Sequence, residues 1–218
     1  MKFVPDSVSA SLFCIVAYAV LIRVVVRASL LFIKKRDKSS SVDLQKGNKW
    51  QRALVLLIGV EIVYVSKENL VIGISLCVIL GSFLVASITD LADFCIYRFC
   101  WWLALSGCVL ILMQVYAGGG SSFENINCRG LLVFILIQKL LFHRFYGEGD
   151  CNGFCVGALV LFCLGKSYET GYYAMGITFL LLGGIQGLKG NVGKKGNLKH
   201  NIALMPYIFS GLLVGILW

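Results

Sequence analysis

Apolar segments long enough to cross a lipid bilayer recur from one end of this chain to the other. A membrane-spanning helix needs about 20 mostly apolar residues, and eight segments approach that length, at roughly 8–33, 53–66, 70–89, 98–116, 128–144, 151–166, 172–188 and 202–218. Of the 218 residues, 58% are hydrophobic and only 14% are charged, too few polar side chains to cover a water-soluble globule. The sequence therefore predicts an all-α polytopic transmembrane helix bundle of about eight spans, with six as the lower bound.

The absence of repeats, the net charge and the cysteines are all consistent with a single membrane domain. No internal repeat or low-complexity tract stands out, so we expect a single domain over residues 1–218. The net charge of +9 lies in short segments between the spans rather than along one amphipathic face, which favours a role in membrane topology over nucleic-acid binding. The nine cysteines lie mostly in apolar stretches and form no paired extracellular pattern, so we expect reduced thiols.

Basic residues in the short loops predict the orientation, because such loops remain in the cytoplasm. The segments 34–52 and 189–201 are both rich in Lys and Arg. With eight spans, placing them in the cytoplasm puts 90–97 and 145–150 on the same side and the N-terminus outside. A cleaved secretory signal is the alternative for the first span, but the apolar run continues to Ile33, which favours an uncleaved helix. We therefore expect a multi-pass protein of the cytoplasmic membrane.

Three charged residues lie inside the first two predicted spans, where charge is costly. Arg23 and Arg27 are four residues apart and share one face of the first helix, and Glu61 lies in the second. Arg27 and Glu61 are predicted roughly 10 Å and 13 Å from the loop that joins the two helices. They are close enough in depth to form an ion pair that fixes helix packing, and snorkelling side chains would serve the same purpose. A role in receiving a substrate is the alternative.

Two further carboxylates lie at span boundaries: Asp90 follows the third span, and Asp150 closes Gly147-Glu148-Gly149-Asp150 before the sixth. Taken alone, Asp150 fits a residue that caps a helix N-terminus. The two glycines, however, allow positive φ and close approach of a peptide. If Asp90 and Asp150 meet, they cannot both ionise easily and will share a proton, as an aspartic protease dyad does. One member then activates water and the other donates a proton to the scissile carbonyl.

Three segments together resemble the type IV prepilin peptidases, GxGD-type intramembrane aspartic endopeptidases that include the archaeal preflagellin peptidases. Asp90-Leu91-Ala92-Asp93-Phe94-Cys95-Ile96-Tyr97 is similar to the segment that carries the first catalytic aspartate, 147–150 matches the GxGD box, and 202–207 resembles the Pro-containing start of the last span. The resemblance covers about 69–218. It implies catalysis by Asp90 and Asp150, with Gly147, Glu148, Gly149 and Asp93 shaping the loop or contacting the substrate.

The chain also departs from the family pattern. Tyr97 replaces the usual Pro, and Asn152 stands where a Lys commonly follows the GxGD aspartate, which bears on leader recognition and loop geometry. Asp93 is the alternative catalytic acid. Aligning Asp93 with the first catalytic aspartate of the family would, however, move Ile96 out of its matching position. Longer family members carry two CxxC pairs and methylate the new N-terminus. This chain has no CxxC, so we expect proteolysis without methyl transfer, no metal site and no cofactor.

The resemblance implies that the enzyme removes a short basic leader from pilin-like or flagellin-like precursors at the cytoplasmic face. Glu148 is expected to attract that leader, and the basic loops are expected to meet acidic lipid headgroups. The partners are therefore a precursor protein and the lipid bilayer, with no nucleic acid. Two other classes remain open: a small multi-span proton- or cation-coupled transporter or channel that uses Arg23, Glu61, Asp90 and Asp150, and a noncatalytic assembly subunit.

Overall fold

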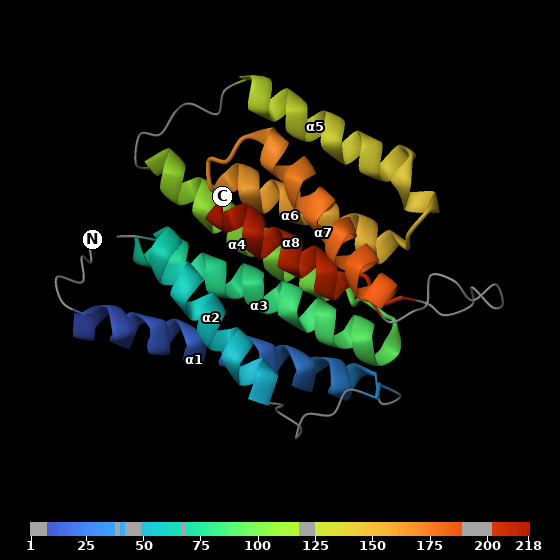
Figure 1. Ribbon diagram of the computed structural model, residues 1–218. Coiled ribbons are helices and arrows are strands. Elements are labelled where there is room, and N and C mark those ends of the chain that lie inside the picture. The colour runs from blue at the N-terminus through green and yellow to red at the C-terminus, as the bar shows by residue number, and fades with distance from the viewer. Residues whose placement is uncertain (1–7, 38–39, 42–48, 67–68, 118–124, 189–201) are drawn as a thin grey trace. The chain divides into compact units, whose positions relative to one another are not determined.

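The computed structural model describes residues 8–37, 40–41, 49–66, 69–117, 125–188 and 202–218 (Figure 1). Within this part of the chain the fold is all-α, as predicted, and contains no strand. The elements are α1 (Val8–Arg36), α2 (Lys49–Ser66), α3 (Leu70–Asp93), α4 (Arg98–Ala117), α5 (Asn125–Leu140), the short 3-10 helix η1 (Phe142–Arg144), α6 (Glu148–Cys163), α7 (Tyr168–Leu188) and α8 (Met205–Leu217). Each predicted span overlaps one α-helix, so the prediction of a helix bundle is confirmed.

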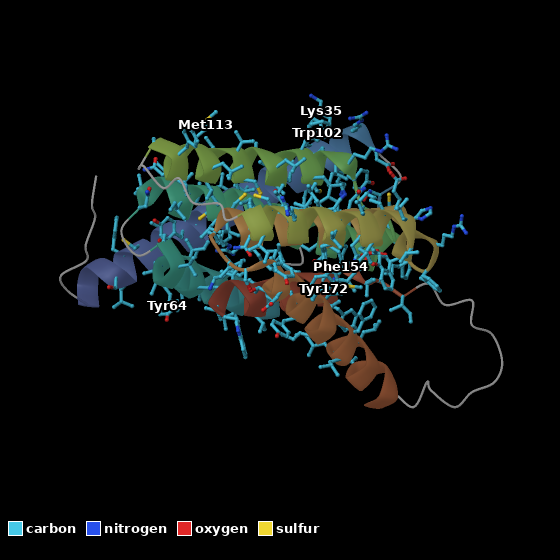
Figure 2. The ribbon with its side chains drawn as sticks, turned by 90° about the horizontal axis from the view of Figure 1, so that it is seen from above. Lys35, Tyr64, Trp102, Met113, Phe154 and Tyr172 are labelled. Carbon is cyan, nitrogen blue, oxygen red and sulfur yellow. The ribbon has the colours of Figure 1, made fainter. Side chains whose placement is uncertain are left out.

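Four helical segments are long and apolar enough to cross a membrane: Ser11–Arg36, Leu70–Asp93, Arg98–Ala117 and Ile126–Arg144. Two shorter apolar segments are Ala53–Ser66 and Met205–Leu217. Large apolar side chains also point outward, and Figure 2 shows Trp102 and Met113 on the outer face of α4, where they are exposed. Such a surface is suited to lipid rather than to water. The chain is therefore a membrane protein.

The helices form two compact units. The first holds α1, α2, α3 up to Val85, and α4; the second holds the last residues of α3 from Ala86 together with α5 to α8. One boundary between the units falls inside α3, which contributes to both. The single domain expected over residues 1–218 stays a prediction.

In the first unit, α1 and α2 pack closely at Gly59 (Figure 1). A Cβ atom on Gly59 would lie 2.9 Å from the carbonyl oxygen of Ile15 and 3.5 Å from Cβ of Ala19, so only glycine permits this approach. Gly59 is ten residues from the start of α2, roughly 15 Å, whereas Ile15 is 21 residues from the end of α1, roughly 32 Å. The contact is therefore much further from the end of α1 than from the start of α2, so the two helices are offset lengthwise.

This offset makes the predicted pairing of Arg27 with Glu61 wrong. Glu61 lies near the level of the N-terminal half of α1, while Arg27 lies far toward its C-terminal end. The Glu61 side chain is only 4% exposed, and both carboxylate oxygens are buried without a hydrogen-bond partner in the described residues. Arg23 and Arg27 are exposed. The prediction failed because it assumed that both helices are level at the joining loop.

In the second unit, α8 packs against α7 and α6. A Cβ atom on Gly211 of α8 would collide with the carbonyl oxygen of Ala174 in α7, so the two backbones touch at this glycine. The C-terminus of α6 is closed by Gly165, whose φ of +75° is the left-handed conformation that glycine favours. The Lys166 amide then donates to the Leu161 carbonyl at 3.0 Å, the bond of a Schellman motif. These contacts fix α6, which carries Asp150, within the unit.

Candidate active site

Asp90 lies in the last turn of α3 and is only 6% exposed. Its Oδ2 accepts a hydrogen bond of 2.9 Å from the backbone amide of Met205, the first residue of α8. The first amides of a helix have no partner within the helix and carry partial positive charge. A hydrogen bond from such a donor favours the ionised carboxylate. The structure thus joins Asp90 to a helix that begins 115 residues later in the chain.

Asp150 lies in the first turn of α6, but it does not act as a helix cap. Gly147 is the N-cap residue, and no side chain caps this end of the helix. The Oδ1 atom of Asp150 is buried without a hydrogen-bond partner among the residues that the structure describes. Burial raises the pKa of Asp150 to about 7, and the nearby negative charge of Asp90 acts in the same direction. Asp150 is therefore suited to carry a proton near neutral pH.

Asp90 and Asp150 line one cavity of about 650 Å³ within the second unit. The two residues predicted to meet are thus brought to the same site, although 60 positions separate them. The rest of the wall is mainly apolar and aromatic: Phe94, Phe142, Phe145, Tyr146, Gly147, Phe179, Leu182, Ile202 and Leu204. A cavity of this volume is within the range that holds a small ligand or a few side chains. Two carboxyl groups thus lie within a largely apolar cavity.

The glycines of the 147–150 segment differ from the prediction. Neither has positive φ; among the described glycines only Gly165 does. Gly147 has φ −58° and faces open space, and a Cβ atom there would have only Asp150 Oδ2 nearby, at 3.9 Å. Gly149 is the tight position, since a Cβ would lie 2.8 Å from Cδ1 and 3.2 Å from Cβ of Ile96. Close approach is thus confirmed at Gly149, and it serves packing against Ile96.

The other predicted site residues lie outside the cavity wall. Glu148 is exposed in the first turn of α6, and Asp93 is partly buried at the end of α3. Asn152 accepts a hydrogen bond from the ammonium of Lys139 in α5. The Lys139 side chain therefore lies next to position 152.

Tyr146 is a site residue that the sequence reasoning missed. Its hydroxyl donates a hydrogen bond to Oε1 of Gln138, a fully buried residue of α5, and the Gln138 amide donates to Sδ of Met175 at 3.0 Å. Burial raises the pKa of Tyr146 above its ordinary value. Its ring centroid lies 5.4 Å from that of Phe154, which Figure 2 labels on α6. The signal in the sequence was the aromatic-rich segment 142–146 directly before Gly147.

The described residues contain no cluster of three or more His, Cys, Asp or Glu side chains placed to hold a metal ion. His143 lies exposed in η1, and His200 lies outside the described part of the chain. The described residues that line the cavity offer two carboxyl groups, a half-buried phenol and aromatic walls.

No family model, no curated protein and no solved structure matches this chain.

Proposed function

We propose that this protein is a membrane-embedded aspartic endopeptidase that removes a short basic leader from prepilin-like or preflagellin-like precursors. The observation that carries the proposal is the pair of carboxyl groups in one apolar cavity with unlike surroundings. Asp90 accepts a hydrogen bond from a helix N-terminus, whereas the Oδ1 of Asp150 is buried without a partner. This difference favours one ionised and one protonated member, which is the state that aspartic proteolysis requires.

The surroundings also support a division of roles. Asp90 is the general base: its carboxylate takes a proton from water as the water oxygen attacks the scissile carbonyl carbon. Asp150 is the general acid: it donates its proton to the carbonyl oxygen, which gives a neutral tetrahedral intermediate. Asp90 then passes its proton to the leaving amine, the C–N bond breaks, and the hydroxyl proton returns to Asp150. The two groups titrate as one pair.

The wall of the cavity indicates the kind of peptide that fits. The rings of Phe142, Phe145 and Phe179 offer apolar contact area next to the two acids. A segment that continues into an apolar helix is suited to this wall, and the four membrane-length helices allow such a helix to lie beside the protein in the bilayer. Glu148 is exposed in the first turn of α6 and supplies negative charge for a basic leader. We place the reaction at the cytoplasmic face because of the basic loops in the sequence.

The proposal is tested with purified protein in lipid nanodiscs and a panel of prepilin and preflagellin precursors. We expect the parent to cleave at least one of them and Asp90→Asn and Asp150→Asn to lose at least about 100-fold in rate, since each removes a proton-transfer group. Asp93→Asn is the matched control and retains activity, because Asp93 does not line the cavity. Cleavage by Asp90→Asn or Asp150→Asn at the parental rate overturns the assignment. Proton or cation flux in proteoliposomes without cleavage supports the transporter instead.

A further inference from the structure

Two arginines of α1 lie in the interior of a membrane-length helix and are exposed. The segment Ser11–Arg36 is long and apolar enough to span a bilayer. Arg23 is 12 residues from its start and 13 from its end, roughly 18–20 Å from either. Arg27 lies one turn further on the same face. Val16 and Val20 continue this face toward the N-terminus and are also exposed. We call Val16, Val20, Arg23 and Arg27 the arginine face.

The other side of α1 is already occupied within the first unit. Ala19, Ile22 and Ile33 are buried, and Ile15 and Ala19 meet Gly59 of α2. Val25 and Tyr18 pack against Gly81 and Gly73 of α3. The four residues of the arginine face take no part in these contacts and are exposed.

A cation in the middle of a lipid-facing helix is costly unless an acceptor neutralises it. Within the described part of the chain, neither Arg23 nor Arg27 has a hydrogen bond or an ion pair. Glu61 is the one described carboxylate inside an apolar helix, and its oxygens are buried without partners. The other described carboxylates lie in the first or last turns of helices or just after one: Asp37, Asp90, Asp93, Glu148, Asp150 and Glu169. None of them lies in the middle of a membrane-length helix, as Arg23 does.

We infer that the arginine face is a docking surface for a membrane-spanning helix of a partner protein that carries an Asp or Glu at the depth of Arg23. Charge complementarity selects this occupant, because a carboxylate forms charge-assisted hydrogen bonds with a guanidinium and removes its cost in lipid. The valines at 16 and 20 supply apolar contact along the same stripe. Among the residues that the structure describes, a second copy of this chain offers no accessible acid in the middle of a helix, because the Glu61 side chain is buried. The inference is independent of the proposed peptidase activity.

The test uses fluorescently labelled full-length protein in lipid vesicles and synthetic leucine-rich transmembrane helices labelled for energy transfer. One peptide carries a single central Glu, a second carries Gln at the same position, and a third carries the Glu near one end. We expect the central Glu peptide to associate roughly tenfold more strongly than the other two. Arg23→Leu and Arg27→Leu should each reduce this preference, and the double variant should abolish it.

Arg129→Leu is the matched control, because Arg129 is an exposed arginine near the start of α5, outside the arginine face. It should leave the preference for the central Glu unchanged. Equal association of the Glu and Gln peptides overturns the inference and indicates arginines that reach the lipid headgroups along the helix. Equal loss in Arg129→Leu overturns it as well. Self-association of labelled protein that requires Arg23 also overturns it, because the occupant is then a second copy.

Discussion

Replacement of Gly149 by Ala tests how the 147–150 segment is held against the end of α3. The added Cβ would lie 2.8 Å from Cδ1 and 3.2 Å from Cβ of Ile96, where carbon atoms in good contact are about 3.5–4.0 Å apart. Overpacking of this kind costs about 1–3 kcal/mol. Replacing a glycine also reduces the conformational entropy of the unfolded chain, which stabilises the folded state by about 0.4–1 kcal/mol. We therefore expect a net loss of stability and a displaced first turn of α6.

Gly147→Ala in the same segment is the matched control. It brings the same restriction of the unfolded chain, but its Cβ meets only Asp150 Oδ2 at 3.9 Å. The difference between the two variants isolates the contact with Ile96 at about 1–3 kcal/mol. For a chain of this length, 1 kcal/mol corresponds to about 2–4 °C in Tm. Gly149→Ala should thus melt ~2–12 °C below Gly147→Ala when both are heated in the same detergent.

A second change identifies Ile96 as the cause. Ile96→Val shortens the side chain by the methyl group that lies closest to the added Cβ. We expect the double variant Gly149→Ala/Ile96→Val to lose about 1 kcal/mol less stability than the two single variants lose together. This difference is the interaction energy of a double-mutant cycle. The reasoning is refuted if Gly149→Ala and Gly147→Ala melt together, or if Ile96→Val restores nothing.

Two further predictions concern the cavity itself. Because the pKa of Asp150 is raised from 3.8 to about 7, its contribution to stability is fully present below pH 3.8 and is lost as the pH rises through about 7. The Tm of Asp150→Asn should therefore fall less steeply than that of the parent from pH 4 to pH 7, and parallel curves would contradict the shift. Tyr146→Phe leaves Oε1 of the buried Gln138 without its donor and should cost about 1–3 kcal/mol, seen as a lower Tm; an unchanged Tm would contradict this role.

The sequence was a good guide to the elements of this fold. Apolar length alone indicated where the helices lie, including the short α6 and α8. It also singled out Asp90 and Asp150, because each stands next to an apolar span and one follows two glycines. It did not indicate Tyr146, whose role depends on a hydrogen bond to Gln138 in α5. It also assigned conformational freedom to Gly147, although the observed φ suits other residues.

Apolar length and charge placement are local properties, and they determined by themselves that this chain is an α-helical membrane protein. The relation between helices depends on side chains far apart in the sequence, and only the tertiary structure decided it. The offset of α2 along α1 is set by the approach of Gly59 to Ile15, which separates Glu61 from Arg27. The bond between Asp90 and Met205 is set by the packing of α8. Burial and the backbone donors at the start of α8, not residue type, make two chemically identical carboxyl groups different.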